Sequence, residues 1–288
     1  MIKKAAIFFT LFVVSLTCFA QNQDSITLAK THWIKTRVAR QVKLFKHHFD
    51  QKNLFSANQN ISFLEVKNSG RKAVFAIDAE AQQLITTSGF GIRDTAIAAI
   101  NGNFFDVKNG GSVDFVKVNG EVINTNRLEK SGSRAFHQKA AVVIRKGKIE
   151  IVKWDGSADW EKNLTDGDVL LNGPLLVFNN QEERLDTAAF NRLRHPRTCV
   201  GLKPNGRAIL LTVDGRNDNS AGMSLFELTK IMRWLGCTSA INFDGGGSTT
   251  LWVNGNGDTG VINYPTDNKK WDHEGQRKVA NVILVKKK

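Results

Sequence analysis

The sequence has little proline or cysteine and no long hydrophobic segment beyond its first residues. Its 288 residues include 4 prolines against 24 glycines, which excludes collagen-like and proline-rich linker architectures. After the first twenty residues, no window approaches the ~20 apolar residues that a membrane-spanning helix needs. No Cys/His cluster has zinc-binding spacing, so we predict neither a metal site nor a cofactor. With 41% hydrophobic and 23% charged residues, the composition is that of a globular protein.

The first twenty residues have the three-part organisation of a secretory signal peptide. Lys3 and Lys4 precede an apolar run at 5–16, and Cys18-Phe19-Ala20 then places small residues where signal peptidase reads them. We therefore predict a signal peptide at 1–20 and an exported mature chain, periplasmic or secreted, after cleavage near Ala20. Lipidation of Cys18 is a weaker alternative, because bulky Phe19 follows it.

Cleavage leaves two cysteines, Cys199 and Cys237, in the mature chain. Both lie in apolar segments, which favours two buried free thiols. A disulfide between them is the open alternative for an exported protein.

Acidic residues are outnumbered, with 27 Asp+Glu against 40 Lys+Arg and a formal net charge of +13. This balance favours anionic partners such as nucleic acid, phosphorylated glycans or an anionic cell surface. Export, a single tyrosine and the lack of a recognition motif count against nucleic acid. A solvated basic surface without a partner is the simpler alternative, and the oligomeric state is not predicted.

Hairpin signals recur along the chain. Asn119-Gly120 separates the apolar runs 115–118 and 121–123, and comparable pairs such as Asn205-Gly206 follow at intervals. One helix is clearly predicted, because Ser224 and Glu227 form a capping box before an apolar stripe with helical spacing. The segment 31–49 fits either a helix or a curved strand.

The domain organisation follows from the absence of a linker or composition break. We predict an α+β fold: a single β-rich domain of mixed or antiparallel strands with a few helices. Residues 61–288 form the domain, and residues 21–60 are an N-terminal segment that packs on its core.

Side-chain amides cluster at two turns that follow apolar strands. Asn101-Gly102-Asn103 and Asn172-Gly173-Pro174 place amides where they can read sugar hydroxyls, with a glycine that lets a ligand approach the backbone. Plain hairpin turns are the alternative for both.

Basic residues surround a histidine in the next motif. Pro196 forces His195 into extended geometry, and Arg197 and Arg216 can each grip a phosphate through paired N–H groups. Arg216 belongs to Asp214-Gly215-Arg216, which follows the motif at the far end of the next apolar stretches. A surface salt-bridge network is the alternative.

Three consecutive glycines follow Asn242-Phe243-Asp244. A tight turn needs only one or two, so Gly245, Gly246 and Gly247 indicate backbone amides that converge on an anion, with Ser248 beside them. The spacing is not that of a phosphate-binding P-loop, because no Gly-Lys-Ser/Thr follows.

Taken in order, these motifs resemble those of the phosphodiester glycosidase family. The resemblance rests on 195–198, 214–216, the helix that opens at Ser224, and 242–249, and it covers roughly 61–285. It implies a hydrolase, similar to an α-N-acetylglucosaminidase, that cleaves a sugar-1-phosphodiester at the anomeric carbon and releases sugar and a phosphomonoester.

The resemblance also implies roles for the motif residues. Asp244 is the first candidate for nucleophile or base and Asp214 the second, while His195 would orient a phosphate oxygen or donate a proton. The expected phosphate ligands are Arg197, Arg216, Gly245, Gly246, Gly247 and Ser248. The expected sugar ligands are Asn101, Asn103, Asn172 and Asn242. Whether the reaction inverts or retains configuration stays open, and the alternative function is a non-catalytic module that binds anionic or phosphorylated cell-surface glycans.

Overall fold

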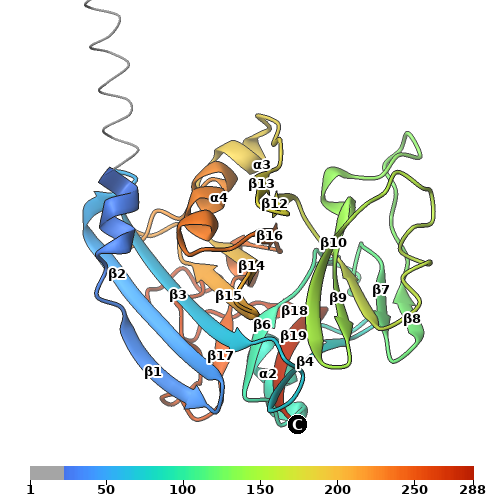
Figure 1. Ribbon diagram of the computed structural model, residues 1–288, viewed down its shortest axis with the longest axis horizontal. Coiled ribbons are helices and arrows are strands. Elements are labelled where there is room, and N and C mark those ends of the chain that lie inside the picture. The colour runs from blue at the N-terminus through green and yellow to red at the C-terminus, as the bar shows by residue number, and fades with distance from the viewer. Residues whose placement is uncertain (1–22) are drawn as a thin grey trace, which may run out of the picture.

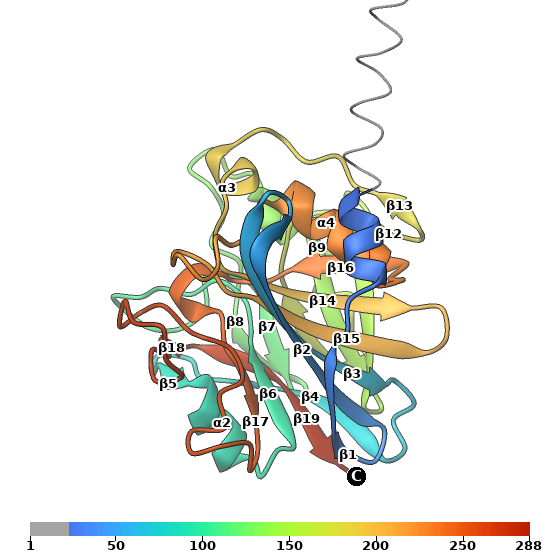
Figure 2. The same cartoon turned by 90° about the vertical axis from the view of Figure 1, so that its left-hand side faces the viewer.

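The computed structural model describes residues 23–288, and its largest element is an eight-stranded sheet (Figure 1). Every strand pair in this sheet is antiparallel. In spatial order the strands are β1 (Ile34–Ala39), β2 (Val42–Leu54), β3 (Ala57–Lys67), β15 (Arg207–Val213), β14 (Arg197–Lys203), β16 (Ser239–Asn242), β12 (Leu175–Phe178) and β13 (Gln181–Glu182). The long strands β2 and β3 cross the face that is turned to the viewer in Figure 2.

Three smaller antiparallel sheets complete the strand content of the described residues. One has five strands and lies at the right of Figure 1: β10 (Lys148–Lys153), β9 (Ala140–Arg145), β11 (Asp168–Leu171), β7 (Val116–Val118) and β8 (Glu121–Asn124). The second has four strands: β17 (Leu251–Val253), β6 (Ala98–Asn101), β19 (Asn281–Lys287) and β4 (Ala73–Ala79). The last pairs β18 (Lys278–Val279) with β5 (Ile85–Thr86).

The helices are short. They are a helix at 23–29, α2 (Thr87–Arg93), α3 (Ala189–Arg192) and α4 (Leu225–Trp234), with single 3₁₀ turns η1 (Phe136–Gln138) and η2 (Gly246–Ser248). Helix α4 has the predicted capping box: Ser224 Oγ accepts from the Glu227 amide at 3.2 Å, and Glu227 Oε2 accepts from the Ser224 amide at 2.9 Å. No helix within residues 23–288 combines the length and apolar character required to cross a bilayer.

The main core lies between the inner face of the eight-stranded sheet and the two smaller sheets. It joins Leu64 and Leu210 of the large sheet to Ile77 and Ile283 of the four-stranded sheet and Val142 of the five-stranded one. A second core covers the outer face of the large sheet, where α4 and the helix at 23–29 pack. The α+β, β-rich prediction is therefore confirmed.

The predicted hairpins are confirmed where turn chemistry is local. Strands β7 and β8 meet across Asn119-Gly120, and β14 and β15 pair in continuous register up to Lys203 and Arg207, across the turn that contains Asn205-Gly206. Segment 31–49, which fits two secondary structures by sequence, forms most of β1 and β2. Residues 34–54 thus contribute two strands to the large sheet instead of only packing on it.

Two of the three cysteines, Cys199 and Cys237, lie in the part of the chain that the structure describes. Both are buried free thiols, as expected. The predicted signal peptide at 1–20, with Cys18, lies outside the described residues.

Candidate active site

Three predicted motifs meet at one end of the central strands of the large sheet, because β14 pairs antiparallel with both β15 and β16. Arg197 at the start of β14 pairs with Val213 at the end of β15, and Cys199 pairs with Asn242 at the end of β16. The ends of β15 and β16 therefore lie beside the start of β14. A cavity of about 350 Å³ opens there, lined by Phe190, His195, Arg197, Arg216, Asp244, Gly245, Gly246, Gly247 and Arg277. We call this cavity the arginine pocket.

Asp244 lies in the arginine pocket, two residues beyond β16. Its amide donates to Gly102 O at 3.1 Å, and its carboxylate accepts from the Gly245 amide at 2.9 Å. The residue is partly exposed as a whole, but its carboxyl group is surrounded by protein atoms. This burial raises the pKa to about 6, against the opposing effects of Ser248, Gly245 and Arg277. The carboxylate is therefore ionised near neutral pH and close to its titration range, which suits a base or nucleophile.

Asp214 lies outside the pocket, in the protein interior. It is 1% exposed and accepts three hydrogen bonds, from Asn60 Nδ2 at 2.7 Å, Asn263 Nδ2 at 2.8 Å and the Tyr264 amide at 3.0 Å. Burial raises its pKa, and these donors oppose the shift. The geometry places this carboxylate between three segments of the chain and away from any ligand in the pocket.

Arg197 lines the pocket with only part of its guanidinium. The residue is 1% exposed; Nε donates to Met223 O at 2.8 Å, and Nη2 donates to Phe190 O at 2.6 Å and to Leu193 O at 3.0 Å. Burial and the charge of Arg216 lower its pKa to about 10. Only Nη1 is left for a ligand. Arg197 therefore cannot bind a phosphate through two parallel N–H groups, as its motif predicts.

Arg216 has the opposite environment. Its side chain is exposed, and within residues 23–288 no carboxylate or carbonyl accepts a hydrogen bond from its guanidinium. The guanidinium lies against Gly246, where a Cβ would be 3.1 Å from Nη2. Its backbone φ of 61° is in the left-handed region, which is costly for a long side chain and is often kept for function. Arg216 is therefore free to bind an anion.

The glycine triplet serves close packing more than anion binding. The Gly245 amide donates to the Asp244 carboxylate, and the Gly246 amide donates to Pro196 O at 2.9 Å. Only the Gly247 amide has no acceptor among the described residues. A Cβ on Gly245 would be 2.5 Å from Pro196 O, so glycine is required for the approach of the histidine–arginine segment. Ser248 is buried, and its hydroxyl lies close enough to Asp244 to oppose the rise in the pKa of that carboxyl.

His195 faces the pocket from the start of this segment and is half-buried. Burial lowers its pKa, and the charges of Arg197 and Arg216 lower it further. The imidazole is thus neutral near pH 7, so one ring nitrogen can accept a proton and the N–H of the other can donate a hydrogen bond.

The four asparagines expected to bind sugar are all buried and lie behind the pocket wall. Asn101 links three site segments: Nδ2 donates to Asp244 O at 2.7 Å, and Oδ1 accepts from Thr198 Oγ1 and the Thr250 amide. Asn103 bonds Leu171 O and Asn281. The others, Asn172 and Asn242, meet at Gly173. None of the four lines the arginine pocket.

Two further residues, Phe190 and Arg277, line the arginine pocket. Phe190 is 40% exposed, and its ring lies 4.9 Å from the Arg197 guanidinium. Arg277 donates from Nε and Nη2 to Asp267 Oδ1, at 3.0 and 2.6 Å, beside Gly247. The position of Phe190 depends on long-range packing, and no distinctive local motif contains it. Within residues 23–288 no three His, Cys, Asp or Glu side chains are arranged to hold a metal ion.

Comparison with known proteins gives a consistent result. A family model described as phosphodiester glycosidase matches residues 94–286. Proteins named N-acetylglucosamine-1-phosphodiester alpha-N-acetylglucosaminidase are similar to this chain. The Bos taurus protein is 32% identical over 127 residues, 41% of this chain and 23% of the relative. The Mus musculus protein is 26% identical over 211 residues, 67% of this chain and 39% of the relative. The chain thus spans well under half the length of these curated relatives.

Solved structures share the fold. The catalytic domain of the zebrafish enzyme of the same name, described as auto-inhibited by its pro-peptide, superposes with a TM-score of 0.64 at 20% identity. That match covers 86% of this chain and 83% of the zebrafish chain. A hypothetical protein from Synechocystis gives a TM-score of 0.63 at 15% identity over 89% of this chain and 64% of its own.

Proposed function

Because the chain belongs to the phosphodiester glycosidase family, we propose that it hydrolyses sugar-1-phosphodiesters at the arginine pocket. The products are free sugar and a phosphomonoester. The observation that carries the proposal is the unpaired Arg216 guanidinium in the same cavity as Asp244, whose pKa is about 6. This reaction requires a permanently charged cation to bind the phosphate and a carboxylate to act as nucleophile or base.

The phosphate is the leaving group, and this determines which catalytic roles the pocket residues must fill. A phosphomonoester has a second pKa of about 6, so it departs with less acid assistance than a sugar alkoxide. The bond that breaks joins the anomeric carbon to the phosphate oxygen, and its electron pair goes to that oxygen. Arg216 stabilises the charge that develops there, with Nη1 of Arg197 and the Gly247 amide as additional donors.

Asp244 supplies the second function. As an ionised carboxylate it either attacks the anomeric carbon, giving a glycosyl ester that water then hydrolyses, or removes a proton from the attacking water. His195, uncharged near neutrality, orients a phosphate oxygen by donating a hydrogen bond from its ring N–H. Phe190 presents an apolar face on which a sugar ring can stack. The sugar is therefore bound by this ring and not by the four buried asparagines.

Oxygen labelling tests this function directly. Purified protein is incubated in H₂¹⁸O with the methyl diester of N-acetylglucosamine 1-phosphate, and both products are analysed by mass spectrometry. Hydrolysis at the anomeric carbon puts ¹⁸O in the sugar. Label in the phosphate would show P–O cleavage and contradict the proposal. Binding without any turnover would favour the non-catalytic glycan-binding module instead.

We further propose that the protein acts outside the cytoplasm, on the basis of the signal-peptide pattern at 1–20. Intact-mass measurement of exported material is expected to give a chain that begins at Gln21. A lipidated Cys18 or an intact Met1 would contradict this expectation.

A further inference from the structure

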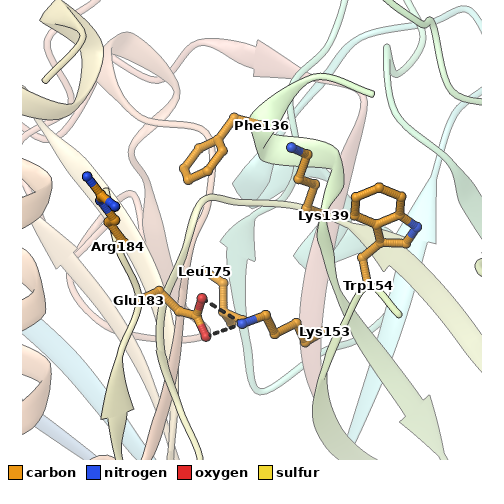
Figure 3. Close-up of a pocket in the computed structure, with 7 residues that line it drawn as sticks. All are labelled: Phe136, Lys139, Lys153, Trp154, Leu175, Glu183 and Arg184. Atoms are coloured by element: carbon orange, nitrogen blue, oxygen red, sulfur yellow. Dashed lines mark hydrogen bonds and ion pairs between the residues drawn. The ribbon is translucent and has the colours of Figure 1, made fainter. Parts of the chain in front are cut away.

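A line of cavities extends from the arginine pocket across the gap between the five-stranded sheet and the end of the large sheet. The first, of about 240 Å³, shares Phe190 with the arginine pocket and contains Pro174 and His137. The second, of about 110 Å³, shares Phe136 with the first. We call this second cavity, which Figure 3 shows in close-up, the distal groove. The shared phenylalanines make the three cavities neighbours along one path.

Aromatic side chains accompany this path from one end to the other. Phe190 and Phe136 are 40% and 38% exposed. Between them, the Phe104 ring lies 5.9 Å from Phe190 and 4.8 Å from His137. Trp154 forms one wall of the distal groove. Exposed rings in a concave surface mark a binding site, and their faces suit the apolar faces of sugars.

Two cations in the distal groove are left uncompensated. Lys153 is neutralised by Glu183, with Nζ 2.6 and 2.8 Å from its carboxylate oxygens. The Lys139 ammonium instead lies between two rings, 5.6 Å from the centroid of Trp154 and 5.8 Å from that of Phe136 (Figure 3). Arg184 is exposed on the facing segment. In the described part of the chain, neither Lys139 nor Arg184 has a carboxylate partner.

We propose that the distal groove binds a further, negatively charged sugar unit of an extended glycan whose scissile phosphodiester lies in the arginine pocket. The proposal rests on the proposed function, and it specifies the substrate class as an anionic oligosaccharide. Sugar rings stack on Phe136 and Trp154, while Lys139 and Arg184 bind the phosphate or carboxylate that the unit carries. A single sugar diester reaches only the arginine pocket.

Two substrates of different length test the proposal. The short one is the methyl diester of N-acetylglucosamine 1-phosphate; the extended one carries two more sugars joined by phosphodiesters. We expect KM for the extended substrate to be about tenfold lower, which corresponds to about 1.4 kcal/mol of added binding. Equal KM values for the two substrates would overturn the proposal. A neutral trisaccharide extension that lowers KM equally would overturn its anionic part.

Variants of the groove locate the effect. Arg184→Glu, an exposed change outside the arginine pocket, should raise KM about tenfold for the extended substrate only, with kcat unchanged. Trp154→Ala should do the same through lost stacking. Lys148→Glu is the matched control, because this exposed lysine lies at the other end of β10. If Arg184→Glu impairs both substrates alike, or if Lys148→Glu gives the same loss, the groove is not the site.

A non-cleavable ligand separates this proposal from the proposed function. If neither substrate is hydrolysed, the hydrolase proposal fails, and the groove is then tested by titration calorimetry with a phosphonate-linked trisaccharide. Binding that Arg184→Glu weakens about tenfold and Lys148→Glu leaves unchanged supports the groove. No binding, or binding that both variants weaken equally, overturns it.

Discussion

The loops after β15 and β16 begin alike and have opposite environments. Each follows a buried strand beside β14, and each contains an Asp-Gly pair. Asp214 is enclosed by three hydrogen-bond donors, whereas Asp244 lines the arginine pocket and accepts from the amide of its own neighbour. The comparison shows that the donors around a carboxylate determine whether it serves folding or is available for chemistry. Neither the dipeptide nor the strand position determines this.

The sharpest test of this difference is Asp244→Asn. Asparagine keeps the size of the side chain and can still accept from the Gly245 amide, but it removes the charge. We expect kcat on a sugar-1-phosphodiester to fall by about three orders of magnitude or more, with little change in substrate binding. Single-turnover kinetics measures the effect, with a thermal melt as the check on folding. A fully active, folded variant would remove Asp244 from the mechanism.

The same substitution at both aspartates, to alanine, should separate their effects on stability. Asp214→Ala leaves three buried donors without an acceptor, and we expect a loss of about 3 kcal/mol in the free energy of unfolding. That loss corresponds to a decrease in Tm of roughly 6–10 °C. Asp244→Ala, the matched control, removes a carboxyl whose ionised form is destabilising, so it should not lower Tm. Equal shifts in calorimetry would show that the two loops are equally structural.

The two arginines extend the comparison to the phosphate site. Lysine at position 216 keeps the charge and loses only the paired N–H geometry, so Arg216→Lys should lower kcat/KM about 30-fold without affecting Tm. Arg197→Lys removes bonds to three backbone carbonyls and should lower Tm as well. Measuring kcat/KM and Tm for both variants decides the matter, and an unchanged Tm for Arg197→Lys would contradict the wall-forming role of this residue.

The smallest expected effect is a pH-dependent gain in stability for Asp244→Asn. Folding raises the pKa of Asp244 from 3.8 to about 6, so the ionised carboxyl reduces stability above pH 6 and has no such effect below about pH 4. After discounting for solvent contact, we expect the variant to be about 1–2 kcal/mol more stable at pH 7.5. The gain should disappear as the pH falls from 6 to 4, as measured by urea unfolding. A gain that is constant with pH would exclude the carboxyl charge as its cause.

The parts of this molecule that were predictable from sequence are those encoded locally. The hairpin at Asn119-Gly120 and the capping box at Ser224 each depend on a few adjacent residues, and both are present. Segment 31–49 could not be assigned, because its alternating basic and apolar residues fit two structures and only pairing with β3 selects the strand.

For the site, the residue types in the motifs predicted which segments form the pocket. They did not predict which side chains face it and which are held by the protein. The order of motifs brings His195, Arg216 and Asp244 to one cavity. Two of the three carbonyls that bind Arg197 belong to α3 and the residue after it, the third belongs to Met223, and no local pattern predicts these contacts. Phe190 faces the same cavity for the same non-local reason. Burial of polar side chains behind a pocket wall, as at Asn101, is likewise decided by packing.

The position of β14 between its two neighbours also has a kinetic consequence. The contacts that close the site span long stretches of chain, 143 residues from Asn101 to Asp244 and 154 from Asn60 to Asp214. Closing such loops costs entropy before any contact is gained, so pairing of this kind slows folding. During refolding, activity should therefore return in the last phase, and the amide hydrogens of Cys199 and Val200 should exchange only when the whole sheet opens.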